Sequence, residues 1–168
     1  MNSIKFYIAL YILLLVPFTS SSQSEFSGSL ILNQQFIGED NGINYEGQIN
    51  YRIDPDISIG ISAAQATMDP KDADKNYDLG KFGIHVSYAF GNYDNFKFES
   101  IVGFSYLHFS EDIVLKENQG AGLDLGVQLV FGIMQKFHYG FKIVSSYSNI
   151  SPGSIVNTGV FVNYNIGK

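Results

Sequence analysis

Residues 96–108, with the sequence FKFESIVGFSYLH, decide the fold because their polarity alternates with a period of two. The apolar face of this stretch carries Phe96, Phe98, Val102, Phe104 and Tyr106, and the polar face carries Lys97, Glu99, Gly103 and Ser105. An amphipathic helix would instead repeat its apolar positions at every third or fourth residue. The stretch therefore predicts a β-strand with one ring-rich face and one polar face.

Seven further stretches alternate in the same way, which makes eight predicted strands. They are residues 26–36, 44–53, 57–62, 82–90, 123–132, 137–146 and 155–166. The connections 54–56, 91–95 and 133–136 are short, whereas 38–42, 68–79, 110–119 and 148–153 are mostly longer and more polar. Short turns at one end and longer loops at the other are typical of transmembrane β-barrels. An even strand count would place both termini on the periplasmic side.

The composition supports a surface that is partly shielded from water. Charged residues make up only 15% of the 168 residues, aromatic residues also reach 15%, and the mean hydropathy is only +0.05. Soluble domains carry about 25% charged residues. A net charge of −6 argues against nucleic-acid binding, which needs a basic face. The absence of cysteine excludes disulfides, thiolate metal sites, cysteine nucleophiles and attachment as a lipoprotein.

Residues 1–22 have the features of a secretory signal peptide. Lys5 supplies the positive charge, residues 6–18 form an apolar run that contains Pro17, and small polar residues follow up to Ser22. The alternative is a retained membrane anchor, but the apolar run is shorter than the ~20 residues of a spanning helix. We expect cleavage before Gln23, which leaves residues 23–168 as one outer-membrane β-barrel domain.

Aromatic residues gather near the ends of the predicted strands. Tyr51, Tyr88, Phe90, Phe96, Phe131, Phe137 and Tyr164 would lie at the periplasmic rim, and Phe36, Tyr45, Phe82, Tyr106 and Tyr147 at the outer rim. Such girdles mark the two interfaces of a bilayer. The soluble alternative is a lipocalin-like ligand-binding barrel with its apolar face inside. The small residues on the polar face favour a narrow interior over a water-facing surface.

The chain resembles the small eight-stranded outer-membrane barrels of the OmpA/OmpX type over the whole mature sequence. The more specific element is the last strand, where Asn157, Gly159, Val162 and Tyr164 match the spacing of the C-terminal assembly signal. The sequence departs from that signal in two ways, because Val162 stands where an aromatic residue is commoner and the chain continues through Gly167 and Lys168. The resemblance implies the outer membrane of a Gram-negative bacterium, and contacts with its lipids and lipopolysaccharide. It also implies recognition by the barrel assembly machinery through the last strand.

Six charged residues fall on the polar phase and are expected in the lumen. They are Glu46, Arg52, Lys97, Glu99, Asp124 and Lys142, three acidic and three basic. Because isolated buried ions are costly, we expect a neutralised ionic plug in which Arg52 meets Glu99. Eight strands enclose a space that side chains can fill, so a closed lumen is predicted. His85 and His138 are expected to face the lumen as hydrogen-bonding groups.

The favoured function is a non-catalytic structural or surface-interaction role, without cofactor or metal. One alternative is a lipid A deacylase-like enzyme, because His108 and Ser110 resemble the His-x-Ser element of that family and Glu111 or Glu117 would orient the histidine. A second is a calcium loop with Asp72, Asp74, Asn76 and Asp78, although Tyr77 stands where the tight turn needs glycine.

Overall fold

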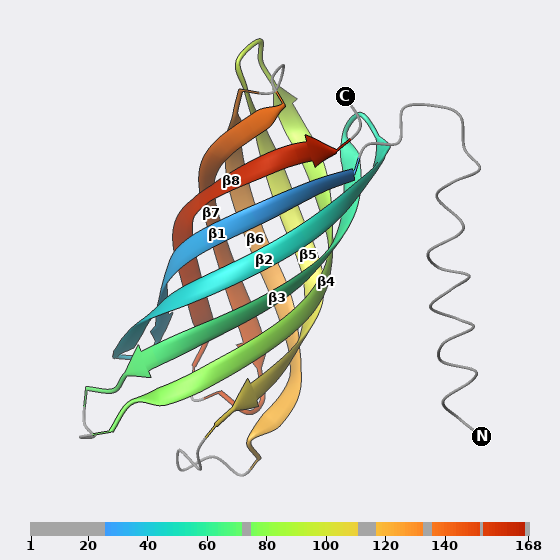
Figure 1. Ribbon diagram of the computed structural model, residues 1–168. Coiled ribbons are helices and arrows are strands. Elements are labelled where there is room, and N and C mark those ends of the chain that lie inside the picture. Colours follow the sequence, from blue (N-terminus) through green and yellow to red (C-terminus); the bar gives the residue numbers. More distant parts are fainter. Residues whose placement is uncertain (1–25, 72–74, 111–116, 133–135, 152, 167–168) are drawn as a thin grey trace, which may run out of the picture.

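Eight antiparallel strands close into a barrel in chain order, each paired with its neighbours in the sequence and β8 with β1 (Figure 1). The computed structural model describes residues 26–71, 75–110, 117–132, 136–151 and 153–166. The strands are β1 (Phe26–Ile37), β2 (Asp40–Asp54), β3 (Ile57–Asp69), β4 (Tyr77–Asn92), β5 (Phe96–Phe109), β6 (Gln119–Phe131), β7 (Phe137–Ser148) and β8 (Ile155–Ile166). The predicted eight-stranded antiparallel barrel is confirmed.

The two ends of the barrel differ in their connections. One end, here called the turn end, holds the connections β2–β3, β4–β5 and β6–β7, together with the first residue of β1 and the last of β8. The other, the loop end, holds β1–β2, β3–β4, β5–β6 and β7–β8 (Figure 1). No helix in the described part of the chain is long and apolar enough to cross a membrane.

Several strands extend further toward the loop end than the sequence predicts. The expected loop at 38–42 is wrong, because β1 runs to Ile37 and β2 begins at Asp40, leaving a two-residue hairpin turn. Gly38 adopts a φ of 61°, a conformation that such turns require and that glycine accepts without strain. Likewise, β3 runs to Asp69 and β4 begins at Tyr77, so the two strands take up both ends of the loop expected at 68–79. The proposed signal peptide lies outside the described residues, as does most of the turn at 133–136.

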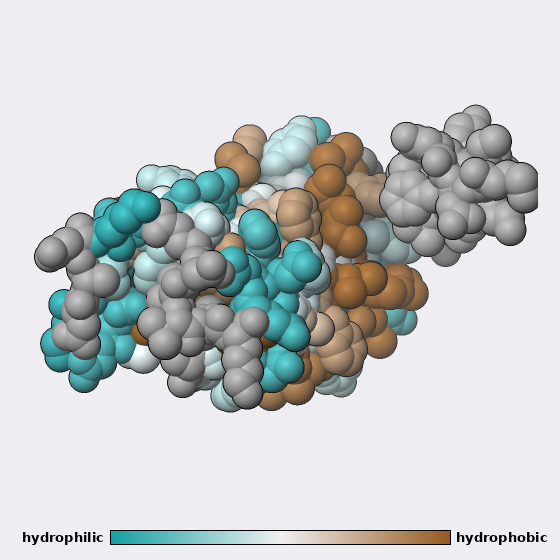
Figure 2. Space-filling view, turned by 90° about the horizontal axis from the view of Figure 1, so that it is seen from below, coloured by the Kyte–Doolittle hydropathy of each residue, from teal (hydrophilic) through white to brown (hydrophobic). Residues whose placement is uncertain are grey.

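A band of large apolar side chains covers the outside of the barrel. Leu30 is 77% exposed, Tyr45 and Phe82 are each 67% exposed, and Phe104 is 66% exposed. Seen from the loop end, hydrophobic residues cover the flank of the barrel and hydrophilic residues gather at the loops (Figure 2). At the turn end, rings from neighbouring strands contact one another, as in the pairs Phe26–Tyr51, Phe96–Phe131 and Phe137–Tyr164. This arrangement is the reverse of a soluble ligand-binding barrel, which carries its apolar face inside.

Toward the loop end, apolar residues move from the outer face of some strands to the inner face. In β5, Phe104 and Tyr106 point outward, but the next apolar residues, Leu107 and Phe109, are buried inside. The same change occurs in β3. Its outward apolar series ends at Gln65, and the apolar residues Ala66 and Met68 that follow are fully buried. Beyond the apolar band, these strands therefore have the pattern of a water-soluble barrel, with polar side chains outside and an apolar core within.

Candidate functional site

A buried ion pair in the middle of the interior joins β2 to β7. Lys142 Nζ lies 2.7 Å from Glu46 Oε1 and donates a second hydrogen bond, 3.0 Å long, to Gln48 Oε1. Gln48 Nε2 lies 2.9 Å from His85 Nε2, and the same ring nitrogen lies 3.1 Å from Asn50 Oδ1. Because every member is hydrogen-bonded, the desolvation cost of the two charges is offset locally.

A second buried pair joins β4 to β6. Lys81 Nζ lies 2.9 Å from Asp124 Oδ2 and donates to Ser146 Oγ at 2.8 Å. Asp124 also accepts a 3.0 Å hydrogen bond from Ser105 Oγ. Lys81 is an interior residue that was not among the predicted lumen charges. Its position, two residues before Gly83 on the polar phase of β4, was the available signal.

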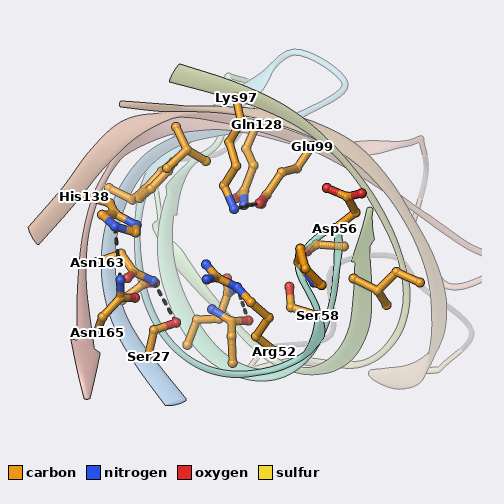
Figure 3. Close-up of a pocket in the computed structure, with 18 of the residues that line it drawn as sticks. Ser27, Arg52, Asp56, Ser58, Lys97, Glu99, Gln128, His138, Asn163 and Asn165 are labelled. Carbon is orange, nitrogen blue, oxygen red and sulfur yellow. Dashed lines mark hydrogen bonds and ion pairs between the residues drawn. The ribbon is translucent and has the colours of Figure 1, made fainter. Parts of the chain in front are cut away.

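The third group of charges lies at the turn end and is shown in Figure 3. Lys97 pairs with Glu99 on its own strand, and Gln128 of β6 donates to the same carboxylate. On another part of the wall, Asn163 donates to Ser27 Oγ at 3.1 Å and Ser29 Oγ at 2.8 Å. His138 lies 3.1 Å from the side-chain nitrogen of Asn165.

All six predicted lumen charges lie on the inner face, and three ion pairs engage five of them, each with a partner that was not predicted. Glu99 is engaged by Lys97 and Gln128, whereas Arg52 comes from the opposite wall (Figure 3). Lys142 pairs with Glu46, and Asp124 pairs with Lys81. The alternation predicts which face a residue takes. It does not predict which charges meet, because that depends on the stagger between strands.

Little free volume accompanies these polar layers. A cavity of about 50 Å³ lies at the turn end, bordered by Arg52, Lys97, Glu99 and His138 among others. A second, of about 20 Å³, lies beside Lys81, His85, Asp124 and Lys142. Spaces of this size hold a few water molecules at most.

The loop end of the interior is filled by an apolar cluster, here called the apolar cap. It consists of Ile37, Ala66, Met68, Tyr77, Leu79, Leu107, Phe109, Ile150 and Ile155. The most exposed members reach only 5% exposure. Tyr77 donates a 2.8 Å hydrogen bond to Asp40 Oδ2, and its burial together with this carboxylate raises the pKa of the phenol. The apolar cap was not predicted, although the apolar residues change phase at Leu107 and Phe109 in the sequence.

The proposed enzymatic pair lies on the outer face at the loop end. His108 and Ser110 are both exposed, and Ser110 Oγ accepts a 2.9 Å hydrogen bond from the backbone N–H of Asp78. Among the described residues, no hydrogen bond joins His108 to Ser110. Glu117 is exposed, and Glu111 lies outside the described part of the chain.

The proposed calcium loop is only partly described. Asp72 and Asp74 lie outside the described residues. Asp78 is the second residue of β4, and its carboxylate accepts a 2.8 Å hydrogen bond from Thr67 Oγ1. In the described ranges, no group of three or more acidic or histidine side chains is placed to hold a metal ion.

The residues of the proposed assembly signal alternate along β8. Asn157 is buried inside the barrel, whereas Val162 and Tyr164 face outward. Gly159 lies against β1, where an added Cβ atom would come within 2.1 Å of the Leu32 carbonyl oxygen. A glycine is thus required at this position by the close approach of the two strands.

The fold is that of the small eight-stranded outer-membrane barrels. The solved structures that resemble it include Neisserial surface protein A, with a TM-score of 0.64, 13% identity, and coverage of 86% of this chain and 98% of that one. Ail of Yersinia pestis matches with a TM-score of 0.59, 14% identity, and coverage of 86% and 100%.

The outer membrane enzyme PagL matches with a TM-score of 0.58, 16% identity, and coverage of 83% of this chain and 99% of that one. No family model matches the sequence, and neither does any curated protein. At these identities the comparisons establish the shared fold.

Proposed function

We propose that this chain is an integral outer-membrane barrel with a closed lumen and a non-catalytic structural or surface-interaction role. The observation that carries the proposal is the reversal of polarity: apolar side chains cover the outside, while the interior is filled by ion pairs and the apolar cap. A lipid-facing barrel explains both features. In the proposed orientation the turn end and both termini are periplasmic and the loop end is external.

Membrane insertion is tested by gel mobility and fractionation. The detergent-extracted protein is run with and without boiling, and cell envelopes are separated into inner and outer membranes. A closed barrel resists SDS until it is heated, so we expect two different mobilities and recovery in the outer-membrane fraction. Recovery of the protein from the soluble periplasm would contradict the proposal.

The expected partners are the lipids around the barrel, including lipopolysaccharide, and the machinery that inserts outer-membrane barrels. The last strand supports the second partner, because Val162 and Tyr164 present an apolar face outward while Asn157 faces inward. Replacing Tyr164 with Ser is expected to slow insertion, measured as the fraction of newly made protein that acquires heat-modifiable mobility. Replacing the outward-facing Tyr139 with Ser is the control.

A lipid A-modifying activity is the second candidate, because His108 and Ser110 share the outer face at the loop end. The backbone hydrogen bond to Ser110 Oγ and the lack of a bond between the two side chains speak for the non-catalytic role. Mass spectrometry of lipid A from cells with the wild-type chain and with the His108→Ala variant distinguishes the two. We expect identical lipid A. Loss of an acyl chain only with the wild type would establish the enzyme.

A further inference from the structure

Two adjoining hollows on the outer face of the barrel form one apolar groove, here called the outer groove. One hollow has a volume of about 700 Å³ and spans β1 to β4, and the other has a volume of about 440 Å³ and spans β8, β1 and β2. They share Leu30 and Gly47 in their walls. The remaining wall residues include Ile49, Ile61, Phe82 and Tyr45.

The floor of the outer groove is made by residues with little or no side chain. Gly47 stands opposite Leu30 on β1 and Ala63 on β3, and Gly28 lies one diagonal step away. A Cβ atom added at Gly28 or Gly47 would meet no other atom within 4 Å. Neither glycine has positive φ. The packing of the barrel therefore does not require glycine at these two positions.

A glycine inside a strand weakens it and commonly marks a close approach by another molecule. At Gly159 the close approach comes from within the barrel, because backbone and side-chain atoms of β1 occupy the space that a Cβ atom would need. Around Gly47 the space is empty, while Leu30, Tyr45 and Phe82 stand up around it with about two thirds or more of their surface exposed. An unfilled hollow between such side chains forgoes dispersion contacts that a ligand would supply.

We propose that the outer groove holds an acyl chain of a lipid from the leaflet at the loop end. The groove is continuous with the apolar band that faces the bilayer, so hydrocarbon is the chemistry that meets it. Leu30, Tyr45 and Phe82 stand beside its glycine floor, so a chain that lies on the floor also contacts their side chains. In a membrane, where burial of apolar area gives no net gain, such additional packing decides what binds.

The position of the groove favours the lipid of one leaflet. Ala63 is two residues from Gln65, where the outward face of β3 becomes polar, and Gln65 stands opposite Tyr45. The headgroup would thus lie at the loop end. This step rests on the proposed outer-membrane location and orientation, in which the loop-end leaflet is the outer one and its lipid is lipopolysaccharide.

The chain has no tryptophan, so a single tryptophan can report on one surface position. The Phe82→Trp variant places the fluorophore at the groove, and Phe141→Trp places it on β7, at a position of similar exposure outside the groove. Each variant is reconstituted into vesicles of phospholipid with brominated chains, which quench tryptophan. Purified lipopolysaccharide is then added, and the recovery of fluorescence measures how far its unbrominated chains displace the phospholipid.

For Phe82→Trp we expect recovery at a mole fraction of lipopolysaccharide about tenfold below that needed for Phe141→Trp, a preference of about 1.4 kcal/mol. Adding Gly47→Leu to Phe82→Trp fills the groove and should abolish this difference, while Val127→Leu on β6 should leave it intact. Equal recovery at both tryptophans would overturn the proposal.

Two other results would also overturn it. Preferential retention of phospholipid at the groove would assign the other leaflet. Protection of Phe82→Trp from quenching together with a doubled protein mass in light scattering would show that a second barrel covers the groove. Heat-modifiable mobility is measured on each preparation, so a failure of the barrel proposal is seen separately from a failure of the groove.

Discussion

At the scale of single residues, the buried ion pairs are the interior groups that are most costly to leave without a partner. Lys142 and Glu46 are both largely withdrawn from solvent, and each depends on the other to offset its desolvation. Lys71 and Glu39 form an ion pair as well, but more than half of each side chain is exposed. The two pairs differ in burial while sharing the same chemistry, so they allow a direct comparison.

We expect Lys142→Met to lower the free energy of unfolding by about 3–5 kcal/mol, because it leaves Glu46 buried without its partner. The control, Lys71→Met, should change it by less than about 1 kcal/mol. Urea unfolding in lipid vesicles measures both. Adding Glu46→Gln to Lys142→Met should recover part of the loss. If the two single lysine variants are equally stable, the buried pair has no special role.

Two glycines of the same barrel should respond in opposite ways to an added methyl group. In Gly159→Ala, the new Cβ atom meets the Leu32 carbonyl oxygen, so the strands must separate and we expect a loss of about 1–3 kcal/mol. In Gly47→Ala the new Cβ atom meets no other atom, so the free energy of unfolding should stay the same or rise slightly. The midpoint of urea unfolding reports both. A destabilised Gly47→Ala variant would contradict the open groove floor.

At the scale of elements, β3 and β5 each carry two polarity patterns in succession. In β3 the outward series Ile57, Ile59, Ile61 ends at Gln65, and from Ala66 onward the apolar residues turn inward. The side chains still alternate, but water replaces lipid as the outer solvent, so the residue types exchange faces. The position of this change on the two strands marks the boundary of the apolar band there.

The boundary can be tested with one residue type at two positions of β3. Ile61→Arg places a charge within the apolar band and should cost about 2–4 kcal/mol, whereas Gln65→Arg, on the same face, should cost about 0–1 kcal/mol. Folding into vesicles monitored by heat-modifiable mobility gives both values. Equal costs would mean that the band extends past Gln65.

At the scale of the whole molecule, closure of the sheet brings residues from distant strands into layers across the interior. The pairs Lys142–Glu46 and Lys81–Asp124 lie between the turn-end cavity and the apolar cap, and the two cavities described above measure only about 50 and 20 Å³. An eight-stranded barrel has room for side chains but not for an open channel as well.

We therefore expect no solute diffusion through the reconstituted protein. Liposomes that contain it should not swell in isotonic solutions of small sugars, in contrast to liposomes with a general diffusion porin. Because the apolar cap fills the loop end of the interior, we also expect no passage of ions. This is measured as the absence of stepwise conductance in planar bilayers. Stable conductance steps that scale with protein concentration would contradict the closed lumen.

The sequence by itself determined the number of strands, their antiparallel order and the face taken by most side chains, because a period of two is a local property of the chain. It placed the six charges Glu46, Arg52, Lys97, Glu99, Asp124 and Lys142 on one face. Lys81 and most of the apolar cap obey the same alternation but were missed because the predicted strands stopped short of the loop end.

Only the tertiary structure decided which of these residues meet. Lys142 pairs with Glu46, which lies 96 positions earlier in the sequence, and Glu99 is engaged by Lys97 and Gln128. Such pairings depend on the stagger of the strands and on the closure of β8 onto β1, neither of which is encoded in any one stretch. The outer groove arises in the same way, since its floor and walls come together only when the strands stand side by side.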